Sequence, residues 1–415
     1  MTPQLSFGEV LRIPSIRRLW IAQIVSVFGD FLAVFAVFSL VTFELHGTPT
    51  QVSMILVSYL IPLAIISPVA GVFVDKWNLK WTMIASDLIR AVLVLALILV
   101  RSNLNAIYAV FFALSTVSSF FMPAQSVAVR TLAPAAGLMA VNALMSQAVQ
   151  GSQIISPAIA GLLVQWFGSY SCFLFDSLSF LFSAAMVFSL SIQRERSPVA
   201  TAPTSVVSSL FQGFRFIFTH PAISFVMLSM TCGMFAVRCF GALLSVYVRD
   251  VLFSTAALFG VLNSLIGIGM IAGTQSMHRF ASRIPKNYLV IYGLCGMGVA
   301  VLVTAVFGKI GTTALGMLGL GFGAALIFIP AQTLMQQETP HDMLGRVSSS
   351  LMSLLAISQV LAMFVAGPVA QKAGLRNLYF GSAAILLVIG AVGLARLRRP
   401  ESGSEAGKAA PASGA

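Results

Sequence analysis

Five charged residues lie inside long apolar runs, where a charge is costly. Three are acids, Asp30, Asp87 and Asp176, and two are arginines, Arg90 and Arg238. A charge at the centre of a bilayer costs at least about 2.5–3.5 kcal/mol on insertion scales, so each of these residues needs a partner, a water-filled cavity or a function. A carboxylate in such a place can bind and release a proton, and a nearby cation changes its proton affinity.

The runs that carry these charges are long enough to cross a membrane. Of the 415 residues, 58% are hydrophobic and only 9% are charged, where a soluble domain has about 25% charged residues. A membrane helix needs about 20 apolar residues. This argues against soluble enzymes, secreted disulfide-stabilised modules and fibrous proteins. The candidate spans are twelve, at 19–43, 51–74, 82–100, 105–127, 139–165, 170–191, 221–248, 256–277, 287–308, 312–336, 347–370 and 376–395.

The longest internal polar segment, from Gln193 to Arg215, divides the spans into six and six. The predicted fold is therefore an all-α membrane protein with two six-helix bundles. The expected parts are a cytoplasmic N-terminal segment (1–18), an N-terminal bundle (19–191), a cytoplasmic linker (192–220), a C-terminal bundle (221–396) and a disordered cytoplasmic tail (397–415).

The distribution of Lys and Arg predicts the orientation. With the N-terminus in the cytoplasm, 17 of the 24 basic residues fall on the cytoplasmic side and 5 fall outside. Basic residues concentrate on the cytoplasmic side of membrane proteins. Both termini are therefore expected in the cytoplasm, and the net charge of +12 needs no nucleic-acid partner.

The two halves of the chain resemble each other. Pro123-Ala-Gln-Ser recurs as Pro330-Ala-Gln-Thr after 207 residues, and Ala160-Gly161 recurs as Ala366-Gly367 after 206. The alternative is a coincidence between helices rich in small residues. A duplicated bundle predicts two pseudo-symmetric halves around a central cavity that rock against each other, which is the plan of a secondary transporter.

The same offset brings two of the buried charges into correspondence. Residue 30 plus 207 is 237, next to Arg238, and both residues lie near the middle of their spans. We expect Asp30 to carry a coupling proton in the cavity and Arg238 to modulate its proton affinity. The alternative is a permanent ion pair that holds the halves together. Asp176 is either a second protonatable site or an acceptor for neighbouring hydroxyls.

Asp87 and Arg90 are spaced i, i+3, which places them on one helix face. They lie toward the cytoplasmic end of the third span, so we expect partial hydration and a mainly structural role. In the cytoplasmic loop region after the second span, Gly71 permits close helix packing, and Asp75 can accept a hydrogen bond from a helix N-terminus or an arginine.

The segment from Gly71 to Lys80, which reads Gly-Val-Phe-Val-Asp-Lys-Trp-Asn-Leu-Lys, resembles the loop motif of the major facilitator superfamily. It departs from that motif at Asn78 and Leu79, where Gly and Arg are usual. In that family the acidic residue latches the outward-facing state, so the resemblance makes Asp75 a candidate latch. The residues assigned to this latch are Gly71, Asp75, Lys76, Asp87, Arg90, Arg130 and Arg346.

The fifth span contains Ser156-Pro157 followed by Ala160-Gly161. This is similar to the antiporter motif of the superfamily, with Ser156 and Ala160 in place of two glycines. Further segments resemble the drug-exporter branch that contains macrolide efflux proteins and the enterobactin exporter. They are Gly29-Asp30, Ala85 to Ala91, Met122 to Ala124, Val141 to Leu144, Ser177 to Phe180 and Leu344 to Val347. The resemblance implies proton-driven export of amphipathic compounds.

Other classes of function find little support in the sequence. There is no nucleotide-binding loop, no nucleophile motif and no metal-ligand spacing among the four His and four Cys, so we expect neither an enzyme nor a cofactor. The expected partners are a small-molecule substrate, protons and the lipid bilayer, for a monomer in a bacterial inner membrane. The alternatives are a nutrient transporter, a lysophospholipid transporter and a non-transporting sensor or scaffold.

Overall fold

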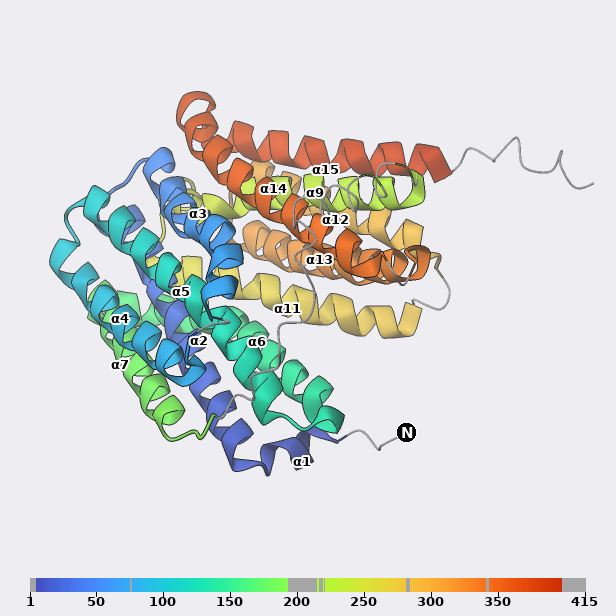
Figure 1. Ribbon diagram of the computed structural model, residues 1–415. Helices are drawn as coiled ribbons and strands as arrows, with labels where there is room; N and C mark the ends of the chain where they lie inside the picture. Colours follow the sequence, from blue (N-terminus) through green and yellow to red (C-terminus); the bar gives the residue numbers. More distant parts are fainter. Residues whose placement is uncertain are drawn as a thin grey trace, which may run out of the picture.

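The computed structural model describes residues 5–74, 77–192, 215, 219, 221–280, 284–340 and 343–397. Most of the expected linker and nearly all of the expected tail lie outside these ranges. Every regular element within them is a helix (Figure 1). The helices are α1 (Phe7–Leu11), α2 (Pro14–Ser39) with its π-helical extension η1 (Leu40–Glu44), α3 (Pro49–Val74), α4 (Leu79–Val100), α5 (Leu104–Leu132), the 3-10 turn η2 (Ala135–Gly137), α6 (Leu138–Phe167), α7 (Ser169–Phe188), α9 (Pro221–Ala242), α10 (Leu244–Asp250), α11 (Ala256–Phe280), α12 (Lys286–Phe307), α13 (Ile310–Glu338), α14 (Leu344–Ala373) and α15 (Leu375–Leu397).

Most of these helices can cross a membrane. In the described part of the chain, ten are long and apolar enough, or eleven when α9 and α10, bent by 40° at their junction, count as one span. The predicted number was twelve. The difference between eleven and twelve is α6. This helix has 30 residues but carries exposed amides at Gln147, Gln150 and Gln153. These polar side chains lower its hydropathy.

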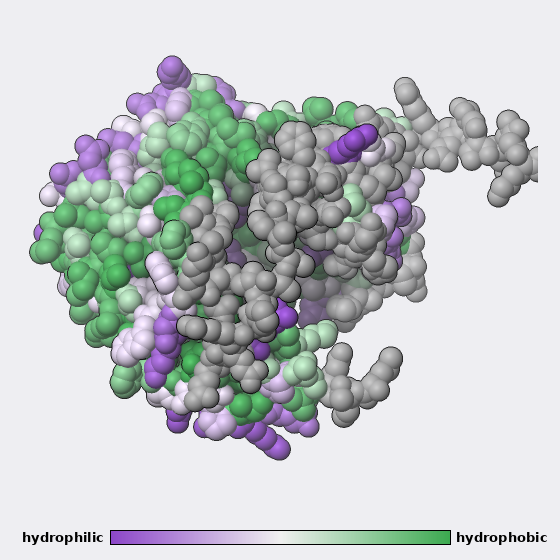
Figure 2. Space-filling view, in the orientation of Figure 1, coloured by the Kyte–Doolittle hydropathy of each residue, from purple (hydrophilic) through white to green (hydrophobic). Residues whose placement is uncertain are grey.

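Helix α4 shows how the sequence divides each helix between lipid and protein. Leu88, Val92, Leu95 and Leu99 recur every three or four residues and are exposed. The opposite face is buried and includes Asp87, Arg90, Ala91, Val94 and Leu97. Figure 2 shows a broad apolar surface on the left of the molecule, where Figure 1 places α4 and α7, with polar groups toward its ends. A surface of this kind suits contact with lipid.

The helices form two groups. In the first, α2 packs on α6 and α7, and α4 and α5 complete the group with α3. In the second, α12 packs on α13 and α15, α11 on α13, and α14 on α9. We call them the N-terminal half and the C-terminal half. Figure 1 shows them splayed apart, with α6 against α11 and α3 near α14.

Contacts between the halves gather at one end of the molecule. A Cβ atom placed on Gly161 of α6 would lie 2.8 Å from the carbonyl oxygen of Ala256 in the first turn of α11. A Cβ atom on Gly367 of α14 would lie 2.6 Å from Cα of Thr50 in the first turn of α3. Both glycines therefore permit backbone contact between halves. We call this the closed end; α1 and the last turn of α15 lie at the opposite end (Figure 1).

Hydrogen bonds also join the two halves at the closed end. The hydroxyls of Thr42 in η1 and Ser245 in α10 lie 2.9 Å apart. Arg249, at the end of α10, donates from Nη1 to the carbonyl oxygens of Thr42 at 2.7 Å and Gly47 at 3.0 Å. The rings of Phe35 and Phe259 stack across the halves, with centroids 4.4 Å apart. The closed end is thus held by packing and by directed hydrogen bonds.

Candidate functional site: a carboxylate cluster around Arg90

Asp87 and Arg90 form a buried ion pair on the inner face of α4. Their side chains are in direct contact, as the i, i+3 spacing predicts. The exposed fractions are 0% for Asp87 and 3% for Arg90, so the expectation of partial hydration is wrong. The pair lies on the face that α4 packs against α5 and α7, and this packing excludes solvent.

Arg90 also contacts two aromatic rings and a second carboxylate. Its guanidinium carbon lies 4.4 Å from the centroid of Phe121 and 4.2 Å from that of Phe180, which are favourable cation–π distances. Its Nη1 atom lies 3.7 Å from Oδ2 of Asp30 on α2. Arg90 is therefore the cation that two aspartates share.

Asp176 on α7 completes the cluster. A Cβ atom on Gly29 would lie 2.5 Å from Oδ1 of Asp176, so this carboxylate packs against the residue next to Asp30. Ser179 donates a hydrogen bond to Oδ1 of Asp176 at 3.2 Å and to its carbonyl oxygen at 2.7 Å. The expected role as acceptor for a neighbouring hydroxyl is present, and it leaves the second carboxylate oxygen available.

The three aspartates differ in their access to the outside of the bundle. The side chain of Asp30 is 36% exposed, whereas Asp87 is 0% and Asp176 is 1% exposed. Asp30 is thus the most exposed carboxylate of the cluster.

Arg238 lies in the other half, on α9. Among the described residues, no ion pair joins it to Asp30, whose neighbouring cation is Arg90 instead. The repeat offset relates the depths of two residues along their helices but not the directions of their side chains. The expected charge partnership of Asp30 and Arg238 is therefore absent from this conformation, and the Arg238 Nε atom has no hydrogen-bond partner in the described part of the chain.

The structure describes only part of the residues assigned to the latch. Asp75 and Lys76 lie outside the described residues. Arg130 is exposed in the last turn of α5, whereas Asp87 and Arg90 are buried. Gly71 lies in the last turn of α3, and Arg346 lies in the first turn of α14; their surroundings are outside what the structure describes.

The Ser156, Pro157 and Gly161 segment lies where α6 crosses α11. The Ser156 hydroxyl donates to the carbonyl oxygen of Phe28 at 3.3 Å. A Cβ atom on Gly260 of α11 would lie 3.2 Å from Cα of Gly161, and Ala158 N–H donates to the Ser264 hydroxyl at 3.2 Å. The segment thus gives the close helix contact expected of small residues, and the contact crosses between halves.

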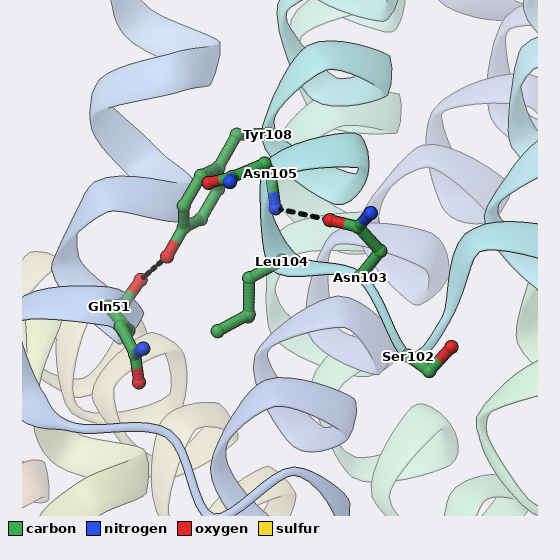
Figure 3. Close-up of a pocket in the computed structure, with 6 residues that line it drawn as sticks. All are labelled: Gln51, Ser102, Asn103, Leu104, Asn105 and Tyr108. Atoms are coloured by element: carbon green, nitrogen blue, oxygen red, sulfur yellow. Dashed lines mark hydrogen bonds between the residues drawn. The ribbon is translucent and has the colours of Figure 1, made fainter.

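A separate pocket lies at the closed end of the N-terminal half (Figure 3). It has a volume of about 440 Å³ and is lined by Gln51, Ser102, Asn103, Leu104, Asn105 and Tyr108. Tyr108 donates to the Gln51 carbonyl oxygen at 2.8 Å. The lining has no charged side chain, so this pocket is distinct from the carboxylate cluster. Within the described ranges, no three His, Cys, Asp or Glu side chains are placed to hold a metal ion.

Sequence comparisons relate the chain to bacterial efflux proteins. It is 27% identical to the uncharacterized MFS-type transporter YfiS of Bacillus subtilis, over 92% of this chain and 93% of that protein. It is 23% identical to macrolide efflux protein A of Streptococcus pyogenes, over 90% and 94%. It is 24% identical to the multidrug efflux pump Tap of Mycolicibacterium fortuitum, over 87% and 91%.

Solved structures share the fold. The nucleoside transporter NupG matches with a TM-score of 0.74 at 15% identity, over 93% of this chain and 100% of that chain. A bacterial homologue of the human lysosomal transporter Spinster, inward-facing and unoccupied, matches with a TM-score of 0.71 at 12% identity, over 92% and 97%. The model of the Major Facilitator Superfamily matches residues 19–363. The chain therefore belongs to this superfamily of membrane transporters and is not an enzyme.

Proposed function

We propose that this protein exports small amphipathic molecules by proton antiport through alternating access. The observation that carries the proposal is the cluster of three aspartates around a single arginine in the N-terminal half. With every group ionised, the cluster would carry two uncompensated negative charges in a region where unpaired charges are strongly disfavoured. Binding of protons removes this excess, so the cluster has a built-in affinity for protons.

Asp30 is the residue that exchanges the proton with solvent. Asp87 is held by direct contact with Arg90 and is fully buried, whereas Asp30 is more distant from Arg90, at 3.7 Å, and partly exposed. Asp176 lies beside Gly29 and serves as the second proton site. Protonation of Asp30 frees Arg90 to pair with Asp87 alone, which changes the attraction between α2 and α4.

Alternating access follows from the position of the contacts between halves. They lie at the closed end, and the Lys and Arg distribution favours a cytoplasmic location for the opposite end, with both termini. The conformation is then cytoplasm-open, in a monomer of the bacterial inner membrane. In the opposite conformation, Gly71, Asp75 and Lys76 with Arg130 and Arg346 would latch the cytoplasmic end.

The cargo class rests on the relatives. The names of two of them refer to macrolide efflux and multidrug efflux, and macrolides and many other drugs are amphipathic. The exposed amides of α6 at Gln147, Gln150 and Gln153 can donate and accept hydrogen bonds without requiring a charged cargo. Such amides suit a cargo-binding surface that accepts molecules of varied structure.

The test is drug tolerance combined with reconstitution. Expression in a drug-sensitive bacterium should raise tolerance to an amphipathic compound, and a protonophore should abolish the gain. In proteoliposomes with a pH gradient, Asp30→Asn should lose proton-coupled transport while the protein still inserts and folds. Coupled transport by Asp30→Asn at the wild-type rate would refute the assignment of Asp30. If none of the compounds tested moved in response to the gradient, proton antiport would be refuted.

A further inference from the structure

Arg238 is a cation near the middle of the C-terminal half that has no counter-ion among the residues described by the structure. It lies in α9, 12 residues before Asp250 at the end of α10. Its side chain is partly buried, and its Nε atom is buried without a hydrogen-bond partner among the described residues. Within the described ranges, no carboxylate forms an ion pair with Arg238.

The sequence of the C-terminal half offers no acid at this depth. Between residues 221 and 397 the acids are Asp250, Glu338 and Asp342. Asp250 pairs with its neighbour Arg249 at 2.6 Å and lies about 18 Å from Arg238 along a helix path with a rise of 1.5 Å per residue. Glu338 ends α13, at the opposite end of the bundle, and Asp342 lies outside the described residues.

The N-terminal half does not supply the missing charge either. Its Asp30 and Asp87 are both paired with Arg90, and Asp176 packs at Gly29 and Ser179. Near the middle of the bundle, the described residues therefore include a surplus of carboxylates in one half and, in the other, the guanidinium of Arg238 without a carboxylate partner. Since an unpaired charge is disfavoured inside a membrane protein, Arg238 has a strong preference for an anion from outside the chain.

The direction of the Arg238 side chain fits a ligand between the halves. Ala236 is fully buried and Phe240 packs on Tyr379 of α15, so this face of α9 is turned to the core of its own half. Arg238 is two residues from each, about 200° around the helix axis. Helix α9 also contacts α3 of the N-terminal half. The partly exposed Met234 and Phe235 flank Arg238 at helical spacing.

We propose that Arg238 binds the anionic group of an amphipathic cargo whose apolar body packs against Met234 and Phe235. This rests on the proposed export function and narrows its substrate class to molecules with a carboxylate or phosphate. The planar guanidinium presents paired N–H donors that match two oxygens of such a group. An uncharged ester of the same molecule leaves Arg238 without a counter-ion, so the site discriminates between acid and ester.

Equilibrium binding tests this without a proton gradient. The full-length protein is placed in nanodiscs of zwitterionic lipid, and binding is followed by intrinsic fluorescence. One set of probes is a panel of arylalkyl carboxylates, each matched with its methyl ester. The second set is lysophosphatidate matched with lysophosphatidylcholine. We expect wild-type protein to bind acids of at least one set tenfold or more tightly than their uncharged or zwitterionic counterparts, and the set that does so shows whether the anion belongs to a soluble cargo or a lipid.

Variants assign the preference to the residue. R238Q should bind acid and ester equally, R238K should keep part of the preference because it retains a point charge, and R101Q, at an exposed arginine of the closed end, should match wild type. Absence of any acid preference in wild type, or an unchanged preference in R238Q, would overturn the proposal. The wild-type protein alone shows whether an acid preference exists. The proposal can therefore still be overturned if R238Q fails to fold. Loss of proton-driven transport with acid binding retained would instead count against antiport.

Discussion

Gly161 and Gly367 are 206 residues apart in the sequence and make corresponding contacts between the two halves. Gly161 of α6 lies against the first turn of α11, and Gly367 of α14 lies against the first turn of α3. In both places a Cβ atom would come closer than 3.0 Å to the backbone of the other half. The repeated Ala-Gly pair thus marks two of the contacts that join the halves at the closed end.

Replacement of either glycine by alanine should open the closed end. The new methyl group meets backbone atoms, which cannot rotate away, so the helices must separate. Gly161→Ala and Gly367→Ala should each shift the population toward the conformation that is open at this end. Spin labels at Ser102 and Lys309, which are exposed there on opposite halves, would report the change as longer distances in pulsed electron resonance.

Gly151→Ala is the matched control, because it lies on the same helix α6 and a Cβ atom there would have no neighbour within 4 Å. It should leave the label distances unchanged. Wild-type distances in both Gly161→Ala and Gly367→Ala would show that these contacts do not hold the end closed.

Arg249 should stabilise the closed end through its hydrogen bonds to the other half. Its bonds to the carbonyl oxygens of Thr42 and Gly47 involve a charged donor, and such bonds contribute about 1.5–3 kcal/mol each. Since about 1.4 kcal/mol corresponds to a factor of ten, Arg249→Gln should raise the population open at this end about tenfold or more. The same spin labels measure this shift.

Lys372→Gln controls for loss of a positive charge, because Lys372 is exposed in the last turn of α14 at the same end. It should behave like wild type. If Lys372→Gln opened the molecule as much as Arg249→Gln, general electrostatics rather than the two carbonyl bonds would explain the effect.

Arg90 should be needed for stability as well as for proton binding. Its removal leaves Asp87 fully buried without its cation, and breaking a buried pair in this way costs about 3–5 kcal/mol. Arg90→Gln should therefore lower the thermal unfolding midpoint in detergent strongly. The double variant Asp87→Asn with Arg90→Gln should recover part of the loss, since it removes the fully buried carboxylate that Arg90→Gln alone leaves without its cation.

For this comparison, Arg101→Gln removes an exposed arginine and should unfold like wild type. A single Arg90→Gln variant as stable as wild type would mean that Asp87 is neutral in the folded protein. The ion pair would then not be the structural anchor of the cluster.

Much of this architecture could be predicted from the sequence, because the relevant signals are local. Apolar runs identify most of the membrane helices, and the i, i+3 spacing of Asp87 and Arg90 identifies their ion pair. The Ser156 to Gly161 segment correctly indicates a close helix contact. The polar helix α6 falls short of the apolar criterion, since its amides face away from its buried side.

The partners of Arg90 could not be predicted, because they depend on how the helices turn toward each other. Asp30 was matched with Arg238 through the repeat offset, but its cation comes from α4 in the same half. Phe180 lies in a segment that resembles the exporter branch, yet nothing in its spacing indicates a ring over Arg90, and Phe121 has no local signal. Packing of α2, α4, α5 and α7 brings these side chains together.

The separation of carboxylates and guanidinium into different halves has an electrical consequence. If one proton enters on Asp30 for each monovalent anion that leaves from Arg238, every cycle moves two elementary charges in the direction favoured by an inside-negative voltage. Each charge gains about 2.3 kcal/mol per 100 mV. Voltage alone would then drive expulsion even where the acidity of the two compartments is equal.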